Sequence, residues 1–561
     1  MADDNKGGIA AALSDMSMET RLLLAFVLMG VVMFVTPYFF PSAPPPKKAP
    51  DKPAAAQSAP VAAPVLAEAP VAGAVAASNE ETPVIDTDLY RVEFSNRGAV
   101  VRSWKLKRYT DHSGGPTELV YVGAAPKVGF PFALSFRDRK PSTDPNQALF
   151  AVRKAEDGLG LDFEFSDGKV SVRKSFRFQK DKYLSEVRSE VIEGGVSIPH
   201  GLTWRAGFGD HTVPAAAPLQ HAIFYDADAA KLHTNDHKHA SDGVTTDSGK
   251  YSFAGLEDTY FAAVFLSDTT LAVQTFSDML KAASENDEVS HVGAAVGAAS
   301  GPNRLSLFVG PKDLDILRSV NPKLEQVVNW GWFGFIAKPI FLMVHWLNDR
   351  YIHNYGWSII IVTLFINMAT FPLKITSLRS AKRMQDLQPQ IKAINEKFKN
   401  LSMRDPKRNQ QNQEIMALYQ KHGVNPLGGC VPLLLQLPFL WAFYQVFTLA
   451  IEMRGAEWLW VKDLSQPETI PIRLLPIAMI ATQFWLQKMT PAAGADPAQQ
   501  RMMLFMPLIF GFMFYGASSG LMLYWLTGNL VAIGQQWFFN KTVHGDVVIA
   551  ASAGTKKPSR K

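Results

Sequence analysis

Long apolar runs gathered between residues 326 and 540 are the feature that most restricts how this chain can fold. The preceding stretch, 84–325, has the composition of a soluble protein, and the mean hydropathy of the chain is zero because the two parts cancel. A helix of about 20 apolar residues is long enough to cross the hydrocarbon core of a bilayer. The sequence therefore predicts a polytopic α-helical membrane protein that carries a large soluble domain.

Six candidate transmembrane helices follow from the apolar runs. Several are shorter than the roughly 20 residues that an average bilayer requires, which predicts a thinned membrane or a tilted, protected arrangement. Four acidic and two basic residues precede the first run, and no small-residue cleavage site follows it closely, so residues 1–40 are expected to include an uncleaved signal anchor. The candidate spans are 22–40, 357–373, 427–451, 470–486, 502–516 and 520–539.

The charges between the spans predict the orientation. The loop 374–422 contains eleven Lys or Arg and four Asp or Glu, which places it in the cytoplasm by the positive-inside rule. Both termini are then cytoplasmic, the basic tail 541–561 agrees, and residues 41–356 lie outside. Lys47, Lys48 and Lys52 oppose this assignment, but long domains cross the membrane largely regardless of charge.

The region before the apolar runs predicts a tether followed by a β domain. Residues 41–83 contain 24 Pro or Ala among 43 positions, a composition typical of a semi-extended linker. From residue 84, segments that alternate apolar and polar residues are separated by turn residues, so 84–325 is expected to form a large all-β sandwich. The single cysteine, Cys430, excludes an intramolecular disulfide. The predicted strands are 89–94, 100–106, 161–165, 170–178, 184–191, 260–266, 270–276 and 304–309.

One cluster in the predicted β domain has the residue types of a zinc site. His233, Asp236, His237 and His239 offer three imidazoles and a carboxylate within seven residues. A solvated polar loop is the favoured alternative, because metal ligands usually come from separate rigid elements, and no metal is expected. No cofactor is expected either, since the stretch 243–251 lacks the spacing of a phosphate-binding loop. The net charge of +5 is too small to indicate direct sequence-specific nucleic-acid binding.

Amphipathic aromatic residues accumulate between the two regions, over residues 326–356. Tryptophan rings prefer the membrane–water interface, and Lys338-Pro339 interrupts the run. We predict an interfacial amphipathic helix, a kink, and entry into the bilayer at Trp357. The alternative is a buried helix of the soluble domain.

The predicted cytoplasmic loop has apolar residues at helical spacing on both sides of Asp405-Pro406, a signal for a helix start. This pattern predicts a helical hairpin, 374–422, with one apolar stripe and a basic outer surface. The basic surface is interpreted either as a set of solvated charges or as a docking surface for a ribosome or an emerging chain. The residues expected to carry docking are Lys382, Arg383, Lys392 and Lys397.

Polar side chains within the C-terminal spans are almost all neutral. Each one alone is best explained as a hydrogen bond between helices, worth about 1 kcal/mol. Together, polar groups in four short spans predict a shared hydrated cavity. A proton-coupled transporter normally needs paired ionisable residues and repeated halves, and neither is visible, so a passive polar groove is expected.

One stretch of the chain reads MALYQKHGVNPLGGCVPLLLQLPFLWAFY. This stretch and four further segments resemble the YidC family of membrane protein insertases, and the resemblance covers essentially the whole chain. It implies a β-supersandwich in the exported domain, similar in fold to sugar mutarotases but with no implied sugar chemistry. It also implies a five-helix core with a hydrophilic groove that is open to the cytoplasm and to lipid and closed toward the periplasm. The segments are IAKPIFLMVHWLN, FPLKITSLRSAKRMQDLQPQI, MALYQKHGVNPLGGCVPLLLQLPFLWAFY, DPAQQRMMLFMPLIFGFMF and SSGLMLYWLTGNLVAIGQQWFF.

The function implied by the resemblance is insertion and folding of nascent proteins in the bacterial inner membrane, with no catalytic residue and no enzyme activity. The implied partners are nascent membrane proteins, the ribosome, the Sec translocon, the signal-recognition machinery and membrane lipids. Two other classes stay open on the residues alone. One is a passive transporter or channel, and the other is a membrane-anchored periplasmic carbohydrate-binding protein.

In the family, an arginine of the second span sits at the centre of the groove, and alignment on Phe-Pro-Leu puts Asn367 at that position. The nearest cation along the span is Lys374, near the predicted cytoplasmic end. An uncharged groove centre is therefore expected, Gln436 is expected to face the groove beside Asn367 and Asn529, and Asn367→Arg is expected to be tolerated. The residues expected to line the groove are Thr363, Asn367, Thr370, Gln436, Pro438, Thr482, Tyr524, Thr527 and Asn529.

Overall fold

The structure is a computed structural model that describes residues 73–111, 114–213, 219–281, 288–398, 407–423, 431–489 and 497–553. The chain divides into two compact units. Of the described residues, the β unit contains 73–341 and Tyr444–Ala456, and the helical unit contains 342–443 and 457–553. The predicted signal anchor, 22–40, lies outside the described residues.

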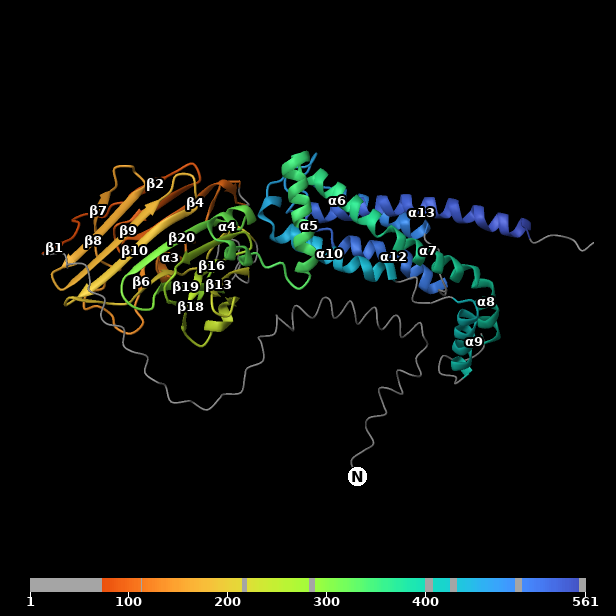
Figure 1. Ribbon diagram of the computed structural model, residues 1–561, viewed down its shortest axis with the longest axis horizontal. Coiled ribbons are helices and arrows are strands. Elements are labelled where there is room, and N and C mark those ends of the chain that lie inside the picture. The colour runs from red at the N-terminus through yellow and green to blue at the C-terminus, as the bar shows by residue number, and fades with distance from the viewer. Residues whose placement is uncertain are drawn as a thin grey trace, which may run out of the picture. The chain divides into compact units, whose positions relative to one another are not determined.

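Three antiparallel sheets form the β unit (Figure 1). The largest has the order β1 (Ala74–Val75), β8 (Gly160–Asp167), β9 (Val170–Phe178), β10 (Leu184–Glu193), β20 (Asn303–Pro311), β17 (Phe261–Leu266), β16 (Tyr251–Glu257), β13 (His221–Asp226), β14 (Lys231–Asn235), with β7 (Ala151–Lys154) on β8 and β11 (Val196–Ser197) on β10. The second has the order β15 (Thr245–Gly249), β18 (Leu271–Leu280), β19 (Val289–Ala298), β12 (Gly201–Trp204), β6 (Leu134–Ser135). The third has the order β2 (Val84–Asp86), β3 (Tyr90–Ser95), β4 (Val100–Thr110), β5 (Pro116–Glu118).

Alternation of side chains explains the core of the β unit. Along β9, the side chains of Val170, Val172, Phe176 and Phe178 point to the same face and are buried. Phe176 packs against Phe94 of β3, with ring centroids 5.0 Å apart. The large apolar area removed from water drives the association of the sheets, at about 25 cal/mol per Å².

All eight predicted strands are confirmed, but several others were not predicted. Strand β19 is rich in alanine and glycine and lacks the apolar–polar alternation that marks a strand in sequence. A small residue is required at Gly297 because another backbone segment lies close to it. A Cβ atom at this position would lie 2.1 Å from the His200 carbonyl oxygen. The tertiary contact therefore decides the composition of this strand.

The predicted linker ends earlier than expected. Ala74 and Val75 form β1 and pair with Asp167 and Ser166 of β8. The Ala77 amide also donates to the Leu149 carbonyl at 3.1 Å. The prediction of a tether up to residue 83 is therefore wrong from residue 73 onward, because main-chain hydrogen bonds attach this segment to the sheet despite its alanine-rich composition.

The helical unit is organised around its last helix, which packs against α6, α7 and α11. No single helix among the described residues is both long and apolar enough to cross a membrane, whereas α6 and α7, bent by 54°, meet that condition as a pair by length and composition. The helices are α6 (Tyr355–Ala369), α7 (Phe371–Asp386), α8 (Gln388–Lys397), α9 (Lys407–Lys421), α10 (Val431–Leu449), α11 (Leu474–Met489), α12 (Pro497–Met513) and α13 (Ser519–Ala553).

The first helix of the hairpin is α8, and so it begins later in the chain than predicted. Proline at position 372 lacks the amide hydrogen that would continue a helix, and α7 starts there and continues to Asp386. Lys382 and Arg383 therefore lie on the helix that follows the bend, not within the hairpin formed by α8 and α9. The apolar stripe is confirmed as a small core of Met384, Leu387, Ile391 and Tyr419. The predicted helix start at Asp405-Pro406 lies outside the described residues.

The segment predicted to lie at the membrane interface contains an amphipathic helix, α5 (Gly334–Leu347), with Pro339 inside it. It follows a 3-10 helix, Pro322–Val327, and precedes a π-helical turn, Asn348–Ile352. One face of α5 is buried, while aromatic residues in and just before the helix are exposed. The buried residues are Ala337, Ile340, Phe341 and Val344, and the exposed ones are Trp332, Phe335 and Trp346.

Candidate functional site

A hydrogen-bonded cluster, called the polar network, joins α6, α7 and α13. The Lys374 ammonium donates to Asn367 Oδ1 at 2.9 Å and to Gln535 Oε1 at 3.4 Å. Gln535 Nε2 donates to the Asn367 carbonyl at 3.1 Å, and Asn367 Nδ2 donates to the Thr363 carbonyl at 2.9 Å. Asn367 and Lys374 lie on either side of the bend between α6 and α7, and the long lysine side chain spans the distance between them.

The polar network contains a cation without an acidic partner. No carboxylate of the described residues forms an ion pair with Lys374, whose hydrogen-bond acceptors are two amide oxygens. An ammonium of this kind gives the site a positive potential, because neutral oxygens orient the charge without cancelling it. The expected uncharged centre at Asn367 is therefore corrected: a cation from α7 contacts the Asn367 side chain directly.

A second polar contact joins α11 to α13. Asn529 is buried, and its Nδ2 donates to the Met479 carbonyl at 3.3 Å and to Thr482 Oγ1 at 3.2 Å. The Thr482 hydroxyl donates to the Ala478 carbonyl of its own helix at 2.8 Å. This arrangement matches the interpretation of single polar residues as interhelical hydrogen bonds.

Three threonines among the predicted lining residues lie in α6, at the C-terminal cap of α6 and in α13. The Thr370 and Thr527 hydroxyls donate to carbonyls of their own helices, those of Ile366 at 2.9 Å and Leu523 at 2.7 Å. The Thr363 hydroxyl is buried and has no partner among the described residues. A buried hydroxyl left unpaired costs about 1–3 kcal/mol. This position therefore favours a hydrogen bond with water or with a polar group of a bound substrate.

The residues predicted on α10 form no hydrogen bond with the polar network among the described residues. Gln436 is exposed and forms no hydrogen bond with Asn367 or Asn529. Pro438 lies inside α10 and is half-buried. The contact between α10 and α13 is instead aromatic, since Phe443 stacks on Tyr524 with ring centroids 3.9 Å apart.

The four predicted docking residues differ in their local partners. Lys382 pairs with Asp386 at 3.5 Å, and Lys397 pairs with Glu414 at 3.4 Å. Arg383 and Lys392 are exposed, and neither forms an ion pair within the part of the chain that the structure describes. The unpaired charges are therefore the ones best placed to meet an acidic partner.

The histidine cluster of the β unit is engaged locally. His239 Nδ1 lies 2.9 Å from Asp236 Oδ1, and together they form a capping box for the 3-10 helix His237–Ala240. The His233 ring stacks on Phe224 with centroids 5.0 Å apart. Within this fully described segment, no three ligand atoms of the cluster lie within 4.8 Å of one another.

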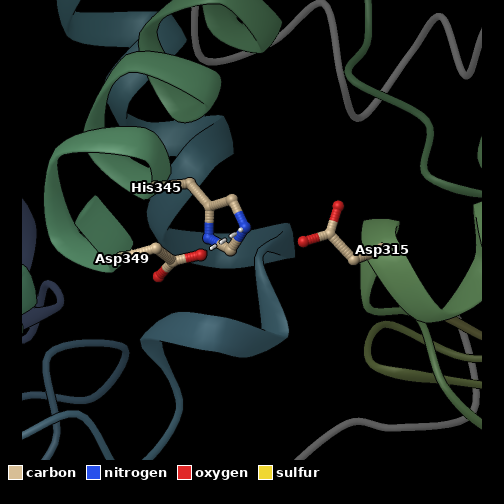
Figure 2. A group of neighbouring side chains, drawn as sticks. All are labelled: Asp315, His345 and Asp349. Carbon is tan, nitrogen blue, oxygen red and sulfur yellow. Dashed lines mark ion pairs between the residues drawn. The ribbon is translucent and has the colours of Figure 1, made fainter.

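A histidine at the end of α5 uses both ring nitrogens. His345 Nε2 forms an ion pair with Asp349 at 3.1 Å (Figure 2), and His345 Nδ1 lies 3.0 Å from the Tyr355 hydroxyl at the start of α6. Asp315, also drawn in Figure 2, is a residue of the β unit. These contacts fix the turn between α5 and α6.

The fold and site define a class of protein: a helical unit with a polar network, joined to a large antiparallel β domain. The family model described as 60Kd inner membrane protein matches residues 346–546, and the model described as YidC periplasmic domain matches residues 83–343. Membrane protein insertase YidC of Geotalea daltonii is 32% identical over 94% of this chain and 100% of its own length. That of Ralstonia nicotianae is 32% identical over 86% of this chain and 88% of its own length.

A crystal structure of an active YidC insertase with its first transmembrane segment resolved is 19% identical, with a TM-score of 0.36, covering 82% of this chain and 93% of that chain. The sequence matches decide the assignment. This chain belongs to the YidC family of membrane protein insertases, which are inner membrane proteins with a periplasmic domain. Its function is membrane protein insertion.

Two members of the polar network were missing from the predicted site. Gln535 looked like one of several polar residues in the last span, and Lys374 looked like a charge near the end of its span. Their sequence signal was weak, because Lys374 follows Asn367 by seven residues but lies beyond the bend between α6 and α7. The contact between α6 and α13, which no single sequence shows, brings the three side chains together.

Proposed function

We propose that the polar network lies on the path that hydrophilic segments of nascent membrane proteins follow across the inner membrane. In this proposal the loop containing α8 and α9 and both termini are cytoplasmic, and the β domain is periplasmic. The excess of basic residues between 374 and 422 supports this orientation. The Thr363 hydroxyl, one helical turn from Asn367, offers a further polar group to the same path.

Short helices support a thinned bilayer around the path. Helices α6, α11 and α12 contain 15, 16 and 17 residues. At a rise of about 1.5 Å per residue they extend about 22–26 Å, less than the roughly 30 Å hydrocarbon thickness of an average bilayer. A shorter dry distance lowers the cost of stripping water from a polar segment.

The driving force in this proposal comes from the substrate itself. A tail that meets polar groups in the path keeps part of its hydration, and the apolar helix behind it moves into lipid. Transfer of that helix releases about 25 cal/mol per Å² of apolar surface. No covalent step and no nucleotide is required. The ribosome, the Sec translocon and the signal-recognition machinery are proposed partners at the cytoplasmic face.

The observation that carries this proposal is the unpaired Lys374 ammonium held by Asn367 and Gln535. A carboxylate about 4 Å away gains about 1 kcal/mol in water and about 4 kcal/mol at a protein surface. Tails with Asp or Glu should therefore insert more readily than matched tails with Lys. The test is insertion of single-span substrates whose tails differ only in the sign of their charge.

The variant Lys374→Met should reduce the acidic-to-basic insertion ratio about fivefold or more, in line with at least 1 kcal/mol of lost attraction. Lys374→Arg keeps the charge and serves as the matched control. An unchanged ratio in Lys374→Met, with the protein present in the membrane at the normal level, would refute the proposed path.

A further inference from the structure

The connection between α10 and α11 contains a tight turn that exposes two apolar residues. Reciprocal main-chain hydrogen bonds between Trp458 and Val461, both 2.8 Å, close the turn around Leu459 and Trp460. Leu459 is 66% exposed and Trp460 is 42% exposed. The turn belongs to the helical unit.

The backbone of this turn is unfavourable for the residue that occupies it. Leu459 has a φ of +50°, in the left-handed region that glycine and asparagine tolerate best. For a leucine this conformation costs roughly 1–2 kcal/mol. The two main-chain hydrogen bonds of the turn offset part of that cost, whereas an exposed leucine side chain gains nothing from water; an apolar environment would stabilise it.

The turn rests on a rigid base. Trp458 is buried. Its ring centroid lies 5.7 Å from that of Trp357 and 5.5 Å from that of Trp460. A Cβ atom at Gly356 would lie 2.2 Å from the Trp458 ring, so the start of α6 is pressed against it. The Trp460 indole N–H donates to Glu468.

Glu468 links the turn to the start of the next helix. It is buried, and its carboxylate accepts the Leu475 amide of α11 at 2.9 Å. The exposed apolar side chains of Trp357 and Ile472 lie at the N-terminal approaches to α6 and α11. Exposed apolar side chains therefore occur both on the turn and at the starts of the two helices that it contacts, and the Trp460 indole N–H is directed at a polar partner, Glu468.

We propose that the Leu459–Trp460 turn is an anchor in the membrane interface, with Leu459 in the acyl boundary and the Trp460 indole at headgroup depth. The partner is a lipid surface, because an apolar ring with a hydrogen-bonded N–H is the side chain that this boundary favours. The turn connects two helices of the core, so its depth sets the depth of both. This inference rests on the proposed placement of those helices in the membrane.

The single cysteine of the chain allows a direct test. In a Cys430→Ser background, the full chain carries an environment-sensitive nitrobenzoxadiazole label at Leu459→Cys and is reconstituted in phospholipid vesicles. Phe512→Cys, on the exposed face of α12, serves as the lipid control, and Asp228→Cys, in an exposed loop of the β unit, serves as the aqueous control. Nitroxide-labelled lipid and aqueous iodide are the two quenchers.

The expected result is that the label at 459 is quenched by lipid nitroxide and protected from iodide at least fivefold relative to the label at 228. Iodide quenching equal to that at 228, with the label at 512 in lipid, would overturn the anchor and leave the proposed function intact. A label at 512 that is itself in water would instead overturn the membrane placement on which both rest. Protection from both quenchers would indicate a protein partner and also overturn the anchor.

A second variant separates the side chain from the backbone. Leu459→Gly relieves the left-handed strain and removes the apolar group, so the turn should form as well as before. With the label moved to Trp460→Cys, the glycine variant should lose at least half of its quenching by lipid nitroxide. Equal quenching with leucine and glycine at 459 would show that Leu459 does not hold the turn in the membrane.

Discussion

The ammonium of Lys374 divides its hydrogen bonds between Asn367 on α6 and Gln535 on α13. Each acceptor is a neutral amide, so the positive charge is oriented but not cancelled. A substitution at any one of the three residues changes the direction of the charge as well as the contact between helices. The predictions at the scale of single residues follow from this.

The variant Asn367→Arg should be harmful in this chain, contrary to the expectation from sequence. It replaces an acceptor 2.9 Å from the Lys374 ammonium with a second cation, and two like charges at about 4 Å repel by at least 1 kcal/mol. The measurement is the amount of protein in the membrane together with insertion of an acidic-tail substrate. Asn367→Arg combined with Lys374→Asn exchanges the two positions and should recover both quantities. A single variant that performs as well as the double variant would contradict the contact.

A buried lysine in the β unit predicts a pH dependence of stability. Lys174 donates to the carbonyls of Gly98 at 2.8 Å, Ala99 at 3.2 Å and Phe132 at 2.8 Å. Burial lowers the pKa of Lys174 to about 7 from its usual value of 10.5. The unfolded chain therefore holds a proton that the folded chain has lost, so the free energy of unfolding should rise as the pH increases from about 7 toward 10.5.

Hydrogen exchange of the β9 amides in the full chain, measured from pH 7 to 9 and corrected for the intrinsic rate, tests this prediction. Protection should increase with pH in the unmodified chain. Lys174→Met removes the titrating group and should flatten the increase, although it also leaves three carbonyls without a donor and lowers protection overall. A slope that survives the substitution would assign the effect to another group.

At the scale of elements, the break between α7 and α8 divides the four basic residues between two helices. Lys382 and Arg383 lie on α7, and Lys392 and Lys397 lie on α8. The small core around Ile391 and Tyr419 holds α8 against α9, and of these four charges only Lys397 reaches across, to Glu414 of α9. Lys382, Arg383 and Lys392 are therefore free to contribute to binding without affecting the fold of the hairpin, whereas Lys397 also links α8 to α9.

The paired and unpaired lysines should differ in ribosome binding. Arg383→Glu with Lys392→Glu reverses two charges that have no acidic partner among the described residues, and should weaken ribosome co-sedimentation at low salt several-fold. Lys382→Glu with Lys397→Glu is the matched control, because those lysines are already partly neutralised by Asp386 and Glu414. Association of the unmodified protein should fall with added salt. An equal loss of ribosome co-sedimentation in both double variants would show that the local ion pairs do not affect ribosome binding.

At the scale of the whole molecule, a segment far along the chain belongs to the β unit. Arg454, from Tyr444–Ala456, is buried and pairs with Asp210, 244 residues away. Its guanidinium also donates to the Thr110 carbonyl at 2.7 Å and lies 5.1 Å from the Tyr260 ring centroid. Burial raises the pKa of Asp210, but hydrogen bonds from Thr212 and Arg454 outweigh it and hold the pKa below its usual value.

Removal of Arg454 should therefore destabilise this segment. Arg454→Met leaves the Asp210 carboxylate buried without its partner, which costs about 3–5 kcal/mol. Hydrogen exchange of β17 should increase accordingly, and Asp210→Asn combined with Arg454→Met should recover part of the loss. Lys462→Met, at an exposed position of the same connection, should have no effect. If both methionine variants behave alike, the buried ion pair is not a stabilising contact.

Deletion of the β domain tests where the insertase function lies. Removal of residues 73–320 should leave insertion of a single-span substrate largely intact, because the polar network belongs to the helical unit. The deletion also removes Thr110 and Asp210, which contact Arg454. Adding Arg454→Gln removes the charge that is left without a partner, and should therefore raise the amount of truncated protein in the membrane. Loss of insertion at normal protein levels would place an essential part of the function in the β domain.

The sequence by itself determined the division into a β domain and an apolar helical region, because alternation and continuous apolar runs are local properties of the chain. It also determined the family, through segments such as NPLGGCVPLLLQLPF. Only the tertiary structure decided that Lys374 contacts Asn367 and Gln535, that β1 extends the largest sheet, and that Arg454 belongs to the β unit. These features depend on contacts between residues that are distant in sequence, or on a side-chain direction set by helix packing, and neither leaves a periodic pattern in the residues.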